Sequence, residues 1–234
     1  MIAAAGTSMK VLVVAPHADD ETLGAGGTIA RLASEGHHVT VAVMTGHGED
    51  EAHPLWPRSV WDTVRGEARE AMAVLGVKDL VFRDVPAALV ADHPTWKLNK
   101  EAVAVTEQVK PDVLLLPFLW DLHKDHREVF HAFSVAWRVA SETGRRIGEV
   151  WAYETLSETH WNAATLEPGF LPNVHVDVSA HLETKIRALG CYKSQMQKPP
   201  ATRSLEAARA QAVWRGAQIG VAAAEAFVLV RRLV

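Results

Sequence analysis

The stretch VLVVAPHADDETLGAGG, from Val11 to Gly27, decides the fold of this chain. Its five uninterrupted apolar residues before Pro16 indicate a strand that is buried on both faces, as in parallel sheets. The glycine-rich part opens a helix over residues 22–36, and residues 37–45 form a second apolar strand. A strand, a helix and a strand of this size make a βαβ unit, whose strands are parallel and joined by a right-handed crossover.

The same alternation of short apolar strands and longer helices continues along the chain. The pattern predicts helices over Val60–Leu75, 97–110, Arg127–Glu142 and 180–192, and strands over 79–84, 112–118, 149–155, 173–179 and 225–234. The 234 residues contain no internal repeat and no domain boundary, and this length suits one domain. We therefore expect an α/β fold with a doubly wound, mostly parallel sheet flanked by helices, formed by residues 9–234 as a single domain after a flexible segment at 1–8.

Composition and charge exclude several classes of protein. The net charge of -4 gives no basic surface of the kind that binds nucleic acid. Cys191 is the only cysteine, which excludes an intrachain disulfide and a cysteine-based zinc site. No apolar run is long enough to span a membrane, and the first residues lack the features of a secretory signal. We expect a cytoplasmic protein with a small-molecule substrate, and its state as monomer or homo-oligomer is left open.

Two of the expected strands end in chemically reactive residues. PHADDE (Pro16–Glu21) follows the first strand, and WDLHKDH (Trp120–His126) follows the strand over 112–118. Ligands of open parallel sheets bind beyond the carboxyl ends of the strands, so both loops converge on one point if their strands lie near the middle of the sheet. The density of carboxylates in the first loop indicates that a positive charge lies among them.

A divalent cation explains this cluster. Zinc binds imidazole nitrogens and carboxylate oxygens, and a catalytic site has three protein ligands and an open position for water. His17, Asp20 and His126 form such a set. Asp19 is then the base that takes a proton from the water, and Glu21 either favours the positive helix N-terminus or holds a neighbouring side chain.

His123 is one ligand too many if the water position is kept. Its better use is as a general acid or as a donor to a developing oxyanion, with Asp125 fixing its tautomer through a hydrogen bond. These residues together predict metal-assisted hydrolysis of an acyl bond.

Other interpretations stay open at this point. The acidic cluster alone can cap a helix, and two histidines with one carboxylate also form the ligand set of ferrous oxygenases. A non-catalytic protein that binds a sugar or another metabolite is a third alternative. A dinucleotide site is disfavoured, because Gly24, Gly26 and Gly27 miss the G-x-G-x-x-G spacing.

The two loops resemble the signature of the LmbE-like (PIG-L) zinc-dependent de-N-acetylase family, P-H-P-D-D-E followed downstream by H-P-D-H. VDVSAHLETKIRALGCYKSQ, near the end of the chain, extends the likeness. The resemblance implies a Rossmann-like fold and removal of the acetyl group from an N-acetylglucosamine-type sugar. It also implies zinc on His17, Asp20 and His126, with Asp19 as base and with His123, steadied by Asp125, assisting the tetrahedral intermediate.

Several positions depart from the family pattern. Ala18 and Lys124 stand where the signature has proline, and Leu122 stands where many relatives carry arginine. Arg65 is the nearest candidate for the substrate-binding arginine of some relatives, and Trp120 is the aromatic residue best placed to stack on a sugar. The long connections at Gly46–Ser59 and Glu158–Pro172 are candidates for pocket walls.

Overall fold

The apolar stretch after Lys10 forms a central strand, β1 (Lys10–Ala15), of a seven-stranded sheet. The computed structural model describes residues 8–48 and 53–234. The remaining strands are β2 (His38–Gly46), β3 (Asp79–Pro86), β4 (Val113–Pro117), β5 (Glu149–Tyr153), β6 (Val174–Asp177) and β7 (Ala224–Arg232). The helices are α1 (Asp20–Ser34), α2 (Arg58–Leu75), α3 (Thr95–Val109), α4 (Lys124–Ala136), α5 (Glu142–Arg146), α6 (Leu182–Leu189) and α7 (Leu205–Ala217), with short 3-10 turns at Val90–Asp92 and Thr159–Trp161.

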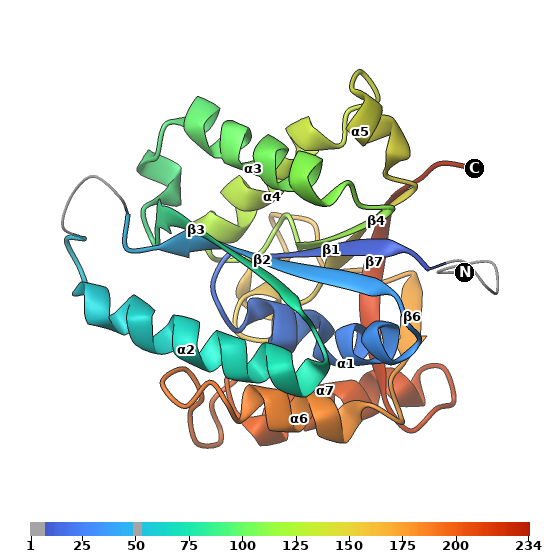
Figure 1. Ribbon diagram of the computed structural model, residues 1–234. Helices are drawn as coiled ribbons and strands as arrows, with labels where there is room; N and C mark the ends of the chain where they lie inside the picture. The colour runs from blue at the N-terminus through green and yellow to red at the C-terminus, as the bar shows by residue number, and fades with distance from the viewer. Residues whose placement is uncertain (1–7, 49–52) are drawn as a thin grey trace.

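The strand order places the two reactive loops side by side. The sheet runs β3-β2-β1-β4-β5-β7-β6, so the chain reverses its direction across the sheet between β1 and β4 (Figure 1). The strands from β3 to β5 are all parallel, and β7 is antiparallel to both β5 and β6. The prediction of a mostly parallel, doubly wound sheet is therefore confirmed, and its switch point lies where the two loops leave adjacent strands.

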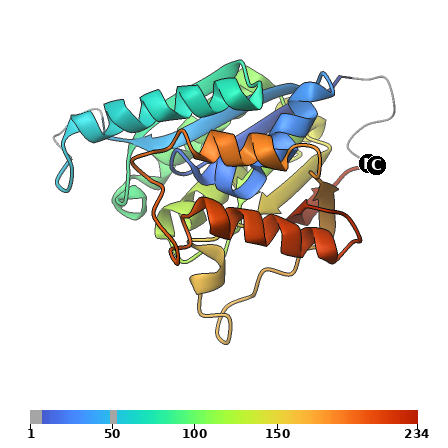
Figure 2. The same ribbon diagram turned by 90° about the horizontal axis from the view of Figure 1, so that it is seen from below.

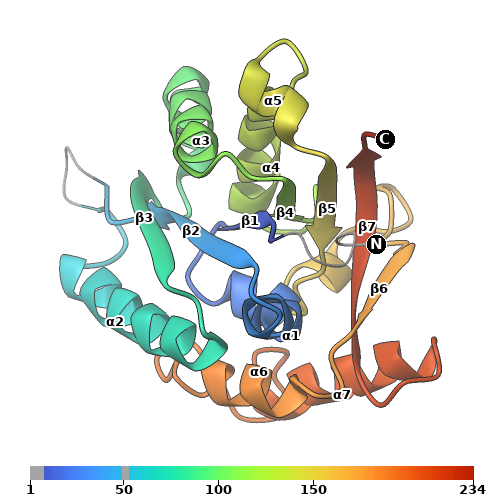
Figure 3. The same cartoon turned by 45° about the vertical axis from the view of Figure 1, so that its right-hand side comes forward.

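Helices cover both faces of the sheet, which explains the uninterrupted apolar strands. Helices α3, α4 and α5 lie on one face, and α1, α2, α6 and α7 lie on the other (Figures 1 and 3). From the second side, α2, α6 and α7 run across the molecule in front of the sheet (Figure 2). Along β1, Val11 and Val13 join the core beneath α1, whereas Leu12 and Val14 join the core beneath α3 and α4. Alternate side chains thus enter opposite cores.

The glycines of α1 let other elements approach this helix closely. A Cβ atom on Gly24 would lie 2.2 Å from the Tyr153 ring, and one on Gly27 would lie 2.8 Å from Val178. The backbone N–H of Gly27 donates to the buried carboxylate of Glu225, which also pairs with Lys185 at 2.6 Å. The segment GAGG is thus a packing motif that seats α1 between the sheet and α6.

The structure differs from the sequence-based expectation in the second half of the chain. The helix predicted over Arg127–Glu142 is two helices, because α4 ends at Ala136 and Ser141 caps α5 by accepting the N–H of Gly144. Helix α7 was not predicted, although Ser204 caps it in the same way. The flexible segment expected at 1–8 lies outside the described residues except for Ser8. Within the described residues, no helix combines the length and the apolar character that a membrane span requires.

Candidate active site

The loops after β1 and β4 bring three ligand atoms together at the switch point. Asp20 Oδ2 lies 3.3 Å from His17 Nδ1 and 3.1 Å from His126 Nε2. Ligands placed tetrahedrally about 2.0–2.1 Å from zinc are separated by roughly 3.3 Å. His126 Nε2 and Asp20 Oδ1 are buried and have no hydrogen-bond partner among the described residues. The three predicted ligands therefore form a group that can hold a metal ion.

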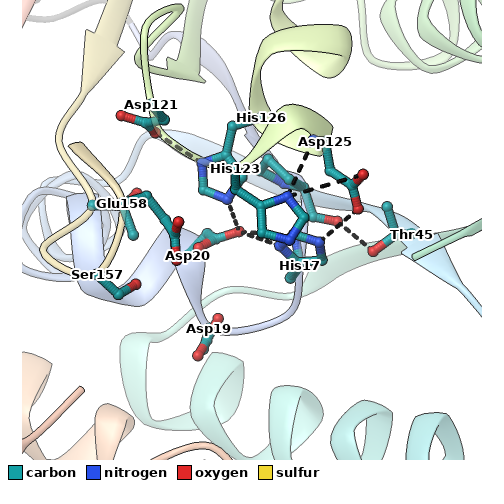
Figure 4. Close-up of polar contacts among 12 residues, drawn as sticks. His17, Asp19, Asp20, Thr45, Asp121, His123, Asp125, His126, Ser157 and Glu158 are labelled. Carbon is teal, nitrogen blue, oxygen red and sulfur yellow. Dashed lines mark hydrogen bonds and ion pairs between the residues drawn. The ribbon is translucent and has the colours of Figure 1, made fainter. Parts of the chain in front are cut away.

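The remaining ring nitrogen of each histidine contacts a carboxylate. His17 Nε2 lies 2.9 Å from Asp125 Oδ2, and His126 Nδ1 lies 2.8 Å from Asp121 Oδ2. Figure 4 shows these two carboxylates on opposite sides of the cluster. Metal-binding histidines are oriented in this way in proteins, because the carboxylate fixes the tautomer and leaves the other nitrogen for the metal.

The charges of the cluster favour a cation at this point. Burial alone would lower the pKa of His17, but hydrogen bonds to Asp125 and Asp20 raise it to about 9. Burial likewise opposes a charge on His126, yet Asp20 and Asp121 raise its pKa well above the ordinary value. The pKa of Asp20 is held well below its usual range, against the effect of burial, by the charge and hydrogen bond of His126. A divalent cation bound here would supply the positive charge that these carboxylates attract and would displace the protons from the ring nitrogens.

Asp19, the predicted base, has a strained backbone next to the ligands. Its φ of 133° lies in a region that residues other than glycine rarely adopt. Its N–H donates to Glu21 Oε2 at 3.2 Å, and Glu21 also accepts the hydroxyl of Tyr192 at 2.5 Å. The carboxylate is buried, and its pKa is raised to about 8 by burial and by the neighbouring charge of Asp20. Glu21 thus holds the backbone of Asp19, a contact that differs from the neighbouring side chain expected for it.

His123 caps α4, and its tautomer is fixed by backbone and not by the Asp125 carboxylate. The N–H of Asp125 donates to His123 Nδ1 at 3.1 Å, whereas the nearer carboxylate oxygen is 4.0 Å away. That carboxylate contacts His17 and accepts the N–H groups of Ala88 and Val90. Asp125 therefore fixes the tautomer of His123 through its backbone N–H, and its side chain takes no part in this hydrogen bond. Because Nδ1 is an acceptor, neutral His123 carries its proton on Nε2, and burial with the charge of His17 lowers its pKa to about 4.

Arg65 lies in the wall of a cavity whose lining includes none of the three predicted metal ligands. This cavity, of about 870 Å³, is lined by Arg65, Asp84, His47, Pro86 and Leu89 among others. The turn that contributes Pro86 and Leu89 to the cavity is the one whose backbone N–H groups hold Asp125. Arg65 Nη2 donates to Asp84 Oδ1 at 3.2 Å and to the carbonyl of Arg83 at 2.9 Å.

Trp120 is half-buried, and its ring lies 5.8 Å from the guanidinium carbon of Arg127. It also packs against the core beneath α3 and α4. These contacts do not bear on the expected stacking against a sugar, which stays a prediction. The long connection Gly46–Ser59 contributes His47 to the cavity wall, and its residues 49–52 lie outside the described residues. Glu158, which begins the other long connection, lies beside the predicted metal ligands (Figure 4).

Three residues near the centre were missed by sequence reasoning. Asp121 lies within the WDLHKDH motif, five residues before His126, and this spacing is its only signal. Glu158 and Arg203 lie outside both motifs, and Arg203 Nη1 is 4.0 Å from Asp19 Oδ2. Glu158 begins one of the long connections expected to form pocket walls, whereas Arg203 has no signal in the sequence, because a distant loop brings it to the site.

Comparison with known proteins places this chain in a family. Residues 12–137 match PIG-L, described as GlcNAc-PI de-N-acetylase. The chain belongs to the PIG-L family. It is 32% identical to a 1D-myo-inositol 2-acetamido-2-deoxy-alpha-D-glucopyranoside deacetylase of Actinosynnema mirum, over 80% of this chain and 81% of that protein. It is 28% identical to the diacetylchitobiose deacetylase of Thermococcus kodakarensis, over 80% of this chain and 70% of that protein.

A solved structure shares the fold of this chain. The conserved protein TT1542 from Thermus thermophilus superposes with a TM-score of 0.74 and 27% identity, covering 97% of this chain and 96% of that one. The predicted membership in the PIG-L family and the predicted fold are therefore confirmed. The named relatives are deacetylases, so the expected enzyme class, a hydrolase of an amide bond, is confirmed as well.

Proposed function

We propose that this protein is a zinc-dependent hydrolase that removes the acetyl group from an N-acetylglucosamine-type amino sugar or glycoconjugate. The observation that carries the proposal is the convergence of His17 Nδ1, Asp20 Oδ2 and His126 Nε2 beside the buried carboxylate of Asp19. The family description and both named relatives share an N-acetylglucosamine unit and differ in what is attached to it. This common part supports the amino sugar as the substrate class.

His17, Asp20 and His126 are the residues that would hold zinc. Zinc bound by two imidazoles and one carboxylate keeps a position for water and polarises a carbonyl group. Asp125 accepts a hydrogen bond from His17, and Asp121 accepts one from His126. Each bond keeps the ring proton on the nitrogen that faces the carboxylate, so the other nitrogen is free to bind the metal.

The chain's own residues supply the proton transfers. Asp19 accepts a proton from water as the water oxygen bonds to the acetamide carbon, and the C–N bond then breaks. The nitrogen takes up the proton that Asp19 received from the water and leaves as a free amine, and the acetyl group leaves as acetic acid, which ionises to acetate. His123 donates its Nε2–H to the carbonyl oxygen while negative charge develops there, a role that its backbone-fixed tautomer supports.

The cavity that shares the turn after β3 with the Asp125 contact is the candidate place for the group attached to the sugar. Arg65 and Asp84 present a donor and an acceptor on the same wall, which is the pairing that sugar hydroxyls require. We assign Arg65 to substrate binding through this pair. Trp120 is retained as the candidate for stacking on the sugar ring.

A turnover assay with the zinc-loaded protein tests the proposal. We expect N-acetylglucosamine glycosides to release amine and acetate in equal amounts. Asp19→Asn is expected to lower kcat by about 10²- to 10⁴-fold, the range for loss of a general base, while the bound zinc is unchanged. Asp62→Asn, an exposed carboxylate on α2, is the matched control. Full activity of the Asp19 variant would exclude it as the base.

The two alternative functions give different results in the same assay. A ferrous oxygenase requires oxygen, so release of acetate under anaerobic conditions excludes it. A binding protein without catalytic activity would retain the sugar in equilibrium dialysis and release no amine with zinc, iron or cobalt.

A further inference from the structure

Arg203 reaches the active site from a segment that shares no motif with it. It precedes Ser204, the N-cap of α7, and its carbonyl accepts the N–H of Gln197 at 2.7 Å. This hydrogen bond joins two ends of a loop within the connection between α6 and α7. It thereby fixes the backbone position from which the Arg203 side chain extends. The side chain is 26% exposed and points back to the junction of β1 and α1.

The guanidinium lies between two carboxylates of different loops. Nη1 is 4.0 Å from Asp19 Oδ2, and Nη2 is 3.6 Å from Glu158 Oε1. Nε donates to Ser157 Oγ at 3.3 Å. Because arginine presents its donors in a rigid plane, the contacts with Ser157 and Glu158 also fix the direction in which Nη1 faces Asp19.

Asp19 needs such a partner. Its backbone is held by Glu21, but its buried Oδ2 has no hydrogen-bond partner among the described residues. Asp20 and Glu21 follow it directly, and both are fully buried carboxyl groups. Their negative charges repel the Asp19 carboxylate and would turn it away from the position beside the metal ligands. Within the described part of the chain, Arg203 is the cation that lies within 4.0 Å of this carboxylate.

We propose that Arg203 is a positioning residue that holds the Asp19 carboxylate in its productive direction, with Ser157 and Glu158 holding the guanidinium. The proposal rests on the function proposed above, in which Asp19 is the base. It assigns a role in the reaction to the connection between α6 and α7. A purely structural role, in which Arg203 only joins its own segment to the Ser157–Glu158 loop, makes different predictions.

The first test is the kinetics of the zinc-loaded variants. A reacting group displaced by about 1 Å can lose roughly 10²-fold in rate. We therefore expect Arg203→Ala to lower kcat by about 10- to 100-fold, with KM within about twofold of the wild type and with unchanged zinc content. Arg203→Lys is expected to restore part of kcat, since it keeps the charge without the planar fork. Arg209→Ala is the matched control, because Arg209 pairs with Glu183 on the surface of α7.

A double variant separates positioning from the other roles. In an Asp19→Asn background, Arg203→Ala is expected to cause no further loss of the residual rate, since the group it positions is gone. A further loss by the same factor would overturn the proposal, and so would a rise in KM at unchanged kcat. If Arg203→Ala does not fold, Arg203→Lys replaces it in the double variant.

A crystal structure gives a result that does not depend on activity. The Asp19 carboxylate of the zinc-loaded Arg203→Ala or Arg203→Lys variant is expected to adopt a different side-chain rotamer from the wild type. An unchanged rotamer in both would overturn the proposal. A wild-type protein that cleaves no N-acetylated sugar would contradict the proposed function, and the rotamer would still decide whether Arg203 orients Asp19.

Discussion

Replacing Asp121 with asparagine tests whether the cluster is a metal site. Asp121 Oδ2 accepts from His126 Nδ1 at 2.8 Å, and Asp121 Oδ1 accepts from the hydroxyl of Thr159 at 2.6 Å. Asp121 and His126 are both fully buried, so water cannot replace a weakened contact. Asparagine keeps the shape and removes the charge, which makes the imidazole a poorer ligand. Loss of such a supporting carboxylate typically weakens metal binding about 10- to 100-fold, or about 1.4 to 2.7 kcal/mol.

Competition with a chromophoric zinc chelator at fixed pH measures this affinity. Asp112→Asn is a suitable control, because Asp112 Oδ2 accepts the N–H of Lys10 at the amino end of β1, away from the cluster. We expect the control to bind zinc like the wild type. If Asp121→Asn binds zinc within about twofold of the wild type while remaining folded, His126 is not a ligand through Nε2, and the interpretation of the cluster is wrong.

Three further predictions concern stability. Gly24→Ala places a Cβ 2.2 Å from the buried Tyr153 ring. Because this overpacks the core, we expect the free energy of unfolding in urea to fall by about 1–3 kcal/mol. Gly66→Ala in α2, which has open space around it, should be neutral or stabilising. Burial would raise the pKa of Glu154, but hydrogen bonds from His160 and Arg215 hold it below its usual value. Its stabilisation is therefore present above the unfolded-state pKa and is lost as the pH falls through the folded-state pKa. Glu154→Gln should flatten the part of the stability curve that lies below the unfolded-state pKa. Zinc at a hundred times its Kd should stabilise the protein by about 2.7 kcal/mol, and a thermal midpoint that does not change with zinc would argue against a folded-state site.

The sequence by itself determined the parallel part of the sheet and the chemical class of the centre. The apolar run at Val11–Ala15 is long enough for a strand and has no polar face, so it can only be stable with helices on both sides. The residue types in each motif, and the order of the two motifs along the chain, can be read directly from the sequence. His17, Asp20 and His126 could therefore be chosen as a set before their distances were known. The end of α4 was misjudged, because the apolar pattern continues past Ala136 while Ser141 already caps the next helix.

Only the tertiary structure decided which groups surround those ligands. The turn that follows β3 binds the Asp125 carboxylate through the N–H groups of Ala88 and Val90, while the backbone N–H of Asp125 donates to His123 Nδ1. Arg203 comes to Asp19 from a loop that is 184 positions further along the chain. Neither contact has a periodicity or a fixed spacing in the sequence, because both depend on where separate loops pack. The strand motifs therefore specify the proposed metal ligands, whereas packing of an outer loop brings Arg203 to the proposed base.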